Sequence, residues 1–261
     1  MSQTVKSGLG LWTQRLIAAI FLGGQVVVHL LRGRIHRRNT IEQMAIVGPD
    51  SLPIALTTAL FVGMVFTIQV AREFINFGAT RAIGGVLAIA LSRELAPVLT
   101  AVVLAGRVGS SFAAEIGTMR VTEQIDALQM LKADPIDYLV IPRLLGCCLM
   151  LPLLTLLSFL IGMTGGTFIA VTLYDIHQSI ILESARGFLS PWDLINAMIK
   201  GAIFGSFIAI IGCSWGLTTT GGAKGVGQST TAAVVTAILT IFISNFFLSW
   251  AMFRGVSTAS F

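Results

Sequence analysis

Residues 51–71 read SLPIALTTALFVGMVFTIQVA, a stretch without a charged side chain. As an α-helix it would measure about 31 Å, which is enough to cross the hydrocarbon core of a bilayer. The composition agrees, because 55% of the 261 residues are hydrophobic and only 11% are charged, whereas soluble domains carry about 25% charged residues. We therefore expect a membrane protein, and the composition excludes an ordinary cytosolic enzyme.

Four further stretches have the length and hydropathy of membrane-spanning helices. They cover residues 82–106, 144–174, 194–216 and 225–253. Arg93 and Glu94 interrupt the first of these near its centre, and Lys200 lies near the start of the third. The sequence predicts an all-α membrane protein in which five transmembrane helices form one domain over residues 46–261.

The first 45 residues hold a shorter apolar stretch, residues 16–31, which is below the usual length of a spanning helix. Polar side chains recur around it at spacings that place them on one helical face. This face holds Gln14, Gln25, His29, Arg32 and His36. The pattern is typical of an amphipathic helix lying in the membrane surface. Residues 1–45 are thus predicted to form an interfacial helix and a basic linker, with a sixth spanning helix as the alternative.

Basic residues predict the orientation of the chain. They are concentrated before the first span and between the second and third spans, and short cytoplasmic loops of membrane proteins are enriched in Lys and Arg. The two loops at 72–81 and 175–193 carry fewer basic residues. We therefore expect a cytoplasmic N-terminus.

The pair Arg93-Glu94 is the first candidate functional feature. Each charge at the bilayer centre costs on the order of 2.5 to 3.5 kcal/mol on insertion scales, so such residues usually mark a functional site. They are interpreted as facing a cavity through which the headgroup of an amphiphile passes, and Pro97 would leave a backbone carbonyl free to line it. The alternative is an ion pair that only fixes helix packing.

An aromatic stripe ends the first span. Phe66, Phe74 and Phe77 recur at helical spacing, with Gln69 beside them. Such stripes more often serve plain packing, but facing a second copy this one would make an apolar wall suited to acyl chains.

The stretch 106–135 is too polar to span the membrane and too helix-prone for an idle loop. Val121, Ile125, Leu128 and Leu131 are predicted to share one helical face, and Asp134-Pro135 should end the helix. Its length and pattern favour a cytoplasmic helix that binds a partner protein.

No catalytic, metal or cofactor site is predicted. The glycine-rich segment 216–231 lacks the Gly-Lys-Ser/Thr ending of a phosphate-binding loop, and it is better explained as a turn between spans. The three cysteines have no CxxC spacing, and the three histidines have no second ligand at helical spacing. The sequence argues against an enzyme acting alone.

The run LSRELAPVLTAVVLAGRVGSSFAAEIGTMRVTEQIDALQMLKADP (residues 91–135), together with Pro142-Arg143 and GGAKGVGQSTTAAVV (residues 221–235), resembles the MlaE/YrbE permease family. The resemblance extends from about residue 40 to the end of the chain. It implies a homodimeric ABC-transporter permease that works with cytoplasmic ATPase subunits and an MCE-domain substrate-binding protein. Its cargo would be phospholipid or a related lipid, moved between the bacterial inner membrane and an outer membrane or envelope, with an organellar envelope as the less favoured location.

The resemblance also implies two sets of site residues. The coupling region 107–135 would contact the ATPase through Glu115, Arg120, Glu123, Gln124, Asp126 and Leu128. The lipid pocket at the dimer interface would be lined by Phe66, Gln69, Phe74, Phe77, Arg93, Glu94 and Leu95.

Two other classes of protein compete with this interpretation. A secondary transporter or channel not coupled to ATP also places charges within its spans, but it would be expected to show inverted repeats or several intramembrane acids. A membrane scaffold would explain the docking helix and leave the costly Arg93-Glu94 pair without a role.

Overall fold

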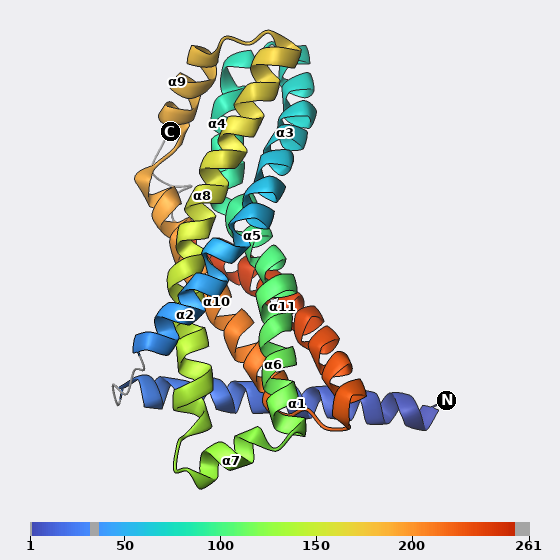
Figure 1. Ribbon diagram of the computed structural model, residues 1–261. Helices are drawn as coiled ribbons and strands as arrows, with labels where there is room; N and C mark the ends of the chain where they lie inside the picture. The colour runs from blue at the N-terminus through green and yellow to red at the C-terminus, as the bar shows by residue number, and fades with distance from the viewer. Residues whose placement is uncertain (1, 32–36, 254–261) are drawn as a thin grey trace. The chain divides into compact units, whose positions relative to one another are not determined.

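The computed structural model of the chain describes residues 2–31 and 37–253, and in these ranges every regular element is a helix (Figure 1). The α-helices are α1 (Ser2–Leu31), α2 (Arg37–Val47), α3 (Leu52–Asn76), α4 (Ile83–Ala90), α5 (Ala96–Leu104), α6 (Ser110–Val121), α7 (Gln124–Met130), α8 (Ile141–Tyr174), α9 (Gln178–Phe188), α10 (Pro191–Leu217) and α11 (Gly222–Phe253). Short 3-10 turns η1 (Pro49–Ser51) and η2 (Thr80–Ala82) precede α3 and α4, and π-helical turns η3 (Leu91–Leu95), η4 (Ala105–Gly109) and η5 (Ile136–Val140) precede α5, α6 and α8.

Six helical stretches of the described chain are long and apolar enough to cross a membrane. Five of them contain the five predicted spans, which confirms a multi-pass all-α membrane protein. The sixth is Trp12–Leu30 in α1, so length and composition alone allow both the interfacial and the spanning interpretation of this helix.

Two boundaries differ from the sequence prediction. The second span was expected to end at residue 106, but helix continues through η4 and α6 to Val121. It can continue because polar groups there find partners, as when Arg107 donates to the Ile46 carbonyl at 3.0 Å. Residues 37–47, expected as a basic linker, form α2.

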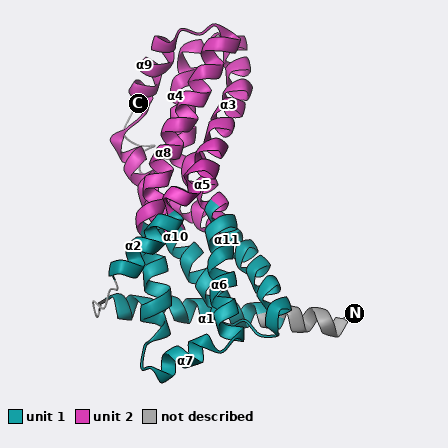
Figure 2. Ribbon diagram, viewed as in Figure 1, with its two compact units in different colours: residues 1–47, 104–148, 205–240 teal, residues 48–103, 149–204, 241–261 magenta. Residues whose placement is uncertain are grey.

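The chain divides into two compact units (Figure 2). Unit 1 comprises residues 1–47, 104–148 and 205–240, and unit 2 comprises residues 48–103, 149–204 and 241–261. The units are described separately below.

Unit 2 packs its helices closely through small residues. A Cβ atom on Gly63 of α3 would overlap the backbone carbonyl of Gly162 on α8, and one on Gly166 would meet Thr67 and Leu87. Small residues at such crossings let helix backbones approach each other in membranes. A buried cluster comprises Leu87, Leu91, Ala96 and Phe159, and Leu91 is the first residue of η3.

In unit 1, the axis of α1 runs at a steep angle to the axes of α6 and of the start of α11 (Figure 1). The Trp12 indole donates to Thr236 of α11 at 3.1 Å, and Arg15 donates to Ser229 at 3.2 Å. Farther along α1, His29 Nδ1 lies 2.7 Å from Asp137 Oδ1 in η5. The helix is therefore joined to α11 near its middle and to η5 near its C-terminal end.

Candidate functional site

The candidate site in unit 2 begins with a backbone irregularity. Residues Leu91–Leu95 form the π-helical turn η3, and Pro97 follows two residues after its end. Proline has no N–H, so the carbonyl four residues before it loses its helical partner. That carbonyl belongs to Arg93, and it accepts a hydrogen bond from Lys200 Nζ at 2.7 Å. The sequence had predicted a freed carbonyl here but not the lysine that binds it.

Glu94 is held by three side chains from α10 and α11. Its Oε1 accepts hydrogen bonds from Lys200 at 3.1 Å and Ser249 at 2.6 Å, and its Oε2 accepts one from Asn245 at 2.7 Å. Lys200 also donates to Ser249 at 2.8 Å, and its side chain is 0% exposed. The Glu94 side chain is 43% exposed. Its carboxylate therefore lies at the outer edge of the cluster and covers the buried Lys200 ammonium.

Arg93 pairs with a different acid. Its Nε donates to Asp193 Oδ1 at 2.9 Å, and the Asp193 side chain is 4% exposed. Asp193 Oδ2 accepts the Ser190 N–H at 3.0 Å, which fixes the carboxylate at the start of α10. Arg93 and Glu94 are adjacent in sequence, yet each finds its opposite charge on α10, so they do not neutralise each other as a pair.

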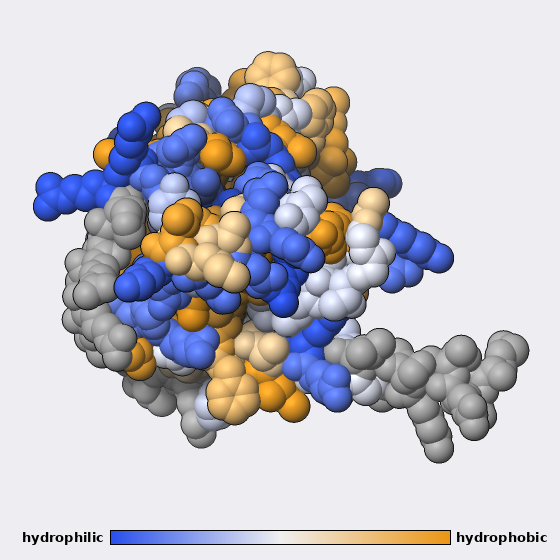
Figure 3. Space-filling model, turned by 60° about the horizontal axis from the view of Figure 1, so that its bottom comes forward, coloured by the Kyte–Doolittle hydropathy of each residue, from blue (hydrophilic) through white to orange (hydrophobic). Residues whose placement is uncertain are grey.

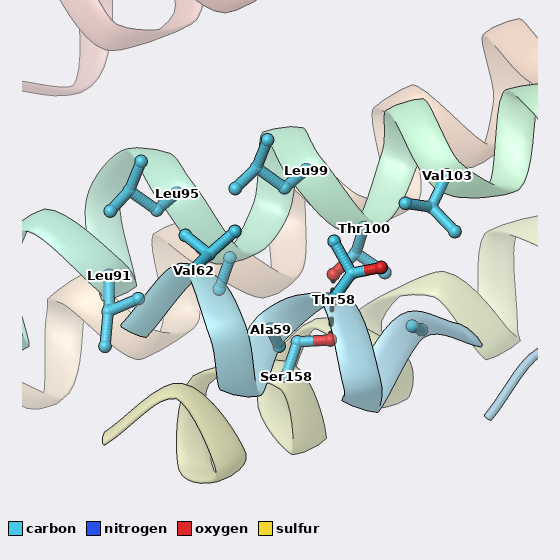
Figure 4. A pocket seen from close by; sticks show the side chains of 11 residues that line it. Thr58, Ala59, Val62, Leu91, Leu95, Leu99, Thr100, Val103 and Ser158 are labelled. Atoms are coloured by element: carbon cyan, nitrogen blue, oxygen red, sulfur yellow. Dashed lines mark hydrogen bonds between the residues drawn. The ribbon is translucent and has the colours of Figure 1, made fainter. Parts of the chain in front are cut away.

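A small recess lies between α3 and the helix that carries Leu95 (Figure 4). Its α3 side has Ala55, Thr58, Ala59 and Val62, its η3–α5 side has Leu91, Leu95, Ala96, Leu99, Thr100 and Val103, and α8 contributes Ser158. Thr100 donates to Ser158 at 2.9 Å. The recess measures about 10 Å³, which suits one water molecule, so an acyl chain would require the two walls to separate.

The seven predicted lipid-site residues do not form one surface. Arg93 and Glu94 belong to the charged cluster, and Leu95 lines the recess. Phe66 packs against the same buried cluster as Leu95, whereas Phe74 packs against another around Ala71 and Ile83. Gln69 is exposed, and Phe77 is 81% exposed after α3 ends. The aromatic stripe is thus divided between packing and exposed positions.

Sequence reasoning missed four residues of the charged cluster. Asp193, Lys200, Asn245 and Ser249 lie about 100 to 155 positions from their partners. A signal was present, because Lys200 is the one charged residue within residues 194–216, and Asn245 and Ser249 are one helical turn apart in an uncharged span.

The predicted coupling residues all lie in unit 1, in two helices instead of one. Helix α6 ends at Val121, α7 begins at Gln124, and Glu123 between them has a left-handed backbone with φ 60°. Arg120 and Asp126 span this break with an ion pair of 2.7 Å. Glu115 is on α6 and pairs with Arg143 at 2.8 Å, so it binds within the chain.

Helix α7 packs against the rest of unit 1 mainly through one buried side chain, and most of its other side chains are exposed. Ile125 is buried, Leu128 is half-buried, and Gln124 and Asp126 are exposed. Leu131 was expected to share the packing face, but it is 79% exposed because α7 ends at Met130, which is 87% exposed. The end of unit 1 that carries α7 is mostly hydrophilic with scattered hydrophobic side chains (Figure 3).

The structure gathers one cluster that sequence spacing did not predict. His29, Asp134 and Asp137 lie together, with His29 Nε2 3.9 Å from Asp134 Oδ2. The short contact of His29 with Asp137 is that of an ion pair or hydrogen bond joining α1 to η5. The turn predicted for the glycine-rich segment 216–231 is confined to residues 218–221, where Gly221 has a positive φ value, and residues 222–231 belong to α11.

Comparisons with known proteins show what this chain resembles. The family model described as Permease MlaE matches residues 40–251. A probable ABC transporter permease protein of Synechocystis sp. is 68% identical over 250 residues, which cover 96% of this chain and 95% of that protein. Protein TRIGALACTOSYLDIACYLGLYCEROL 1, chloroplastic, of Arabidopsis thaliana is 54% identical over 92% of this chain and 69% of that protein. A probable ABC transporter permease protein of Pyropia yezoensis is 49% identical over 95% of this chain and 94% of that protein.

Proposed function

Because this chain belongs to the MlaE permease family, we propose that it is the transmembrane subunit of an ABC transporter that moves phospholipid or a related lipid. A separate cytoplasmic ATPase powers the movement, which runs between the bacterial inner membrane and an outer membrane or envelope. The name of the Arabidopsis relative includes the name of a glycolipid, trigalactosyldiacylglycerol. This supports a lipid as the cargo.

The observation that carries the proposal is the charged cluster of Arg93, Glu94, Asp193 and Lys200 within apolar helices. A lipid headgroup combines an anionic phosphate with hydrogen-bonding groups, and the cluster presents the partly exposed side chains of Arg93 (26%) and Glu94 (43%), which the buried Asp193 and Lys200 hold in place. The buried Asn245 Oδ1 has no hydrogen-bond partner in the described part of the chain. Such an acceptor is costly unless something supplies a donor, and a headgroup hydroxyl or ammonium would do so.

The acyl chains require an apolar path beside this cluster. Leu95 and Leu99 line the recess against α3, next to the turn that carries Arg93 and Glu94. Since the recess has room for only about one water molecule, transport needs a second conformation in which α3 and α5 move apart. Binding of nucleotide by the ATPase selects between the two conformations through its different affinity for each.

Helix α7 is the element that we assign to ATPase binding. It presents Gln124, Asp126, Met130 and Leu131 to its surroundings, while Ile125 fixes it to unit 1. A few exposed apolar residues among charged ones are typical of protein interfaces. The Arg120–Asp126 ion pair holds α7 against the end of α6, so a push on α7 is passed to the helix that continues from the second span.

Three further parts of the proposal rest on the family. The permease works as a homodimer, an MCE-domain protein receives or delivers lipid on the far side of the membrane, and α1 lies in the cytoplasmic interface. The crossing of α1 over α6 and α11 in unit 1 supports the last of these.

The test is mass spectrometry of the lipids and proteins retained when the tagged chain is gently extracted. Wild type is compared with Arg93→Ala/Glu94→Ala and with the matched control Glu183→Ala/Arg186→Ala, which removes the same charges from α9. We expect an ATPase to co-purify with all three proteins. Phospholipid should be retained by the wild type and the control only. Equal lipid retention in the Arg93/Glu94 variant would refute the site, whereas absence of an ATPase from every preparation would favour a secondary transporter or channel.

A further inference from the structure

A separate, shallow and open groove lies in unit 1 along the first half of α11, beside Trp12 of α1. Its volume is about 680 Å³. It is lined by Trp12 of α1 and by Ala223, Lys224, Gly227, Gln228, Thr231, Ala232 and Val235 of α11. The α11 residues recur at intervals of three and four, so they form one face of the helix. None of them belongs to the charged cluster or to α7.

The lining changes from polar to apolar along the groove. Lys224 and Gln228 are exposed near the start of α11, whereas Val235 and the Trp12 ring provide apolar surface farther along. Lys224 and Val235 are separated by about 16 Å of helix. None of the lining residues is acidic, so the groove combines one positive end with one apolar end, as an anionic amphiphile requires.

The position along the chain matches the depth of lipid headgroups. Lys224 is the last charged residue before the long uncharged run of α11, which begins at Gly225. Trp12 hydrogen-bonds to Thr236, and tryptophan is enriched at membrane interfaces. The distribution of basic residues places this turn on the cytoplasmic side, where the leaflet carries anionic lipids.

We propose that this groove binds an anionic phospholipid of the surrounding cytoplasmic leaflet. The phosphate lies against Lys224 and Gln228, and one acyl chain follows Gly227, Thr231 and Val235. The bound lipid lies against the Trp12 ring and so adds a contact that holds α1 in the interface. This site is independent of the cargo and of the ATPase.

The experiment uses the full chain, with its co-purifying subunits, in nanodiscs that contain equal amounts of phosphatidylglycerol and phosphatidylcholine. Native mass spectrometry measures the ratio of the two lipids retained. One lysine near an anionic surface contributes about 1 kcal/mol, or roughly fivefold in affinity. We expect Lys224→Ala to lower the preference for phosphatidylglycerol about fivefold and Lys224→Glu about 30-fold, while Arg186→Glu, at an exposed position on α9, leaves it unchanged.

A second variant tests the shape of the groove. A Cβ atom on Gly227 meets no atom within 4 Å, so Gly227→Leu extends into the groove without a clash. It should reduce retention of both lipids, whereas Gly187→Leu, equally open on α9, should not. No preference for phosphatidylglycerol in the wild type, an equal effect of Arg186→Glu, or photocrosslinks from Gln228 to a second copy instead of lipid would each overturn the proposal.

Discussion

Replacing Lys200 with methionine removes the cation that joins η3 to α10 and α11. Its ammonium donates to the Arg93 carbonyl, to Glu94 and to Ser249 at 2.7 to 3.1 Å. Methionine is similar in volume, so the change removes charge and hydrogen bonds without leaving a large cavity. The carbonyl freed by Pro97 then has lost this donor, and the Glu94 carboxylate has lost its cation.

The magnitude follows from how far each group is buried. Removing one partner of a fully buried ion pair costs about 3 to 5 kcal/mol. Lys200 is 0% exposed but the Glu94 side chain is 43% exposed, so solvent or headgroups compensate part of the loss. We expect Lys200→Met to lower the free energy of unfolding by about 2 to 3 kcal/mol.

A double-mutant cycle separates the ion pair from other effects of the substitution. Glu94→Gln keeps an oxygen that accepts from Asn245 and gains an –NH2 group that donates to the Ser249 hydroxyl, while the charge is removed. Combined with Lys200→Met, it should restore about 1 to 2 kcal/mol, because two neutral partners replace one unpaired charge. Unfolding by denaturant in mixed lipid–detergent micelles measures all four proteins. A loss below about 0.5 kcal/mol for Lys200→Met, the range of ordinary surface changes, or strict additivity would refute the role given to this pair.

Three further outcomes are expected. Gly63→Ala should lower thermal stability by about 2 kcal/mol or more, because its Cβ would overlap the Gly162 carbonyl, while Gly187→Ala in open space should stay within about 0.5 kcal/mol; equal effects would refute the close crossing of α3 and α8. Glu123→Gly should retain or raise stability, since glycine adopts the left-handed backbone freely, and Glu123→Val should lower it by about 1 kcal/mol; the reverse order in denaturant midpoints would refute the strained break between α6 and α7. Arg143→Met should cost about 2 kcal/mol, because the buried guanidinium pairs with Glu115 and packs over Phe112; an unchanged unfolding midpoint would show that this contact is not formed.

The fold class could be predicted from sequence because a bilayer imposes a simple length requirement on apolar helices. Residues 51–71 meet it, and they lie within η1 and α3. The helix boundaries at 106 and 121 could not be predicted as well, because hydropathy falls after residue 106 while the helix itself continues and buries Phe112 and Ile116 inside the protein.

The candidate site was only half predictable. Arg93 and Glu94 stand out since charges within an apolar run are rare. Their partners did not follow, because Asp193 and Lys200 are brought to them by helix packing over about 100 residues. The break at Glu123 was also missed, since a periodic apolar pattern from Val121 to Leu131 continues across a residue that adopts a left-handed backbone.

The most direct test of ATP-driven lipid transport measures the transfer of labelled phospholipid in reconstituted liposomes. The liposomes contain the complex that is purified by a tag on this chain. Transfer should require ATP, and Glu123→Lys/Asp126→Lys should retain ATP hydrolysis while transfer falls to the level without ATP. Transfer that proceeds equally without ATP, or that follows an imposed ion gradient, would contradict the assignment of this chain as an ATP-powered lipid permease.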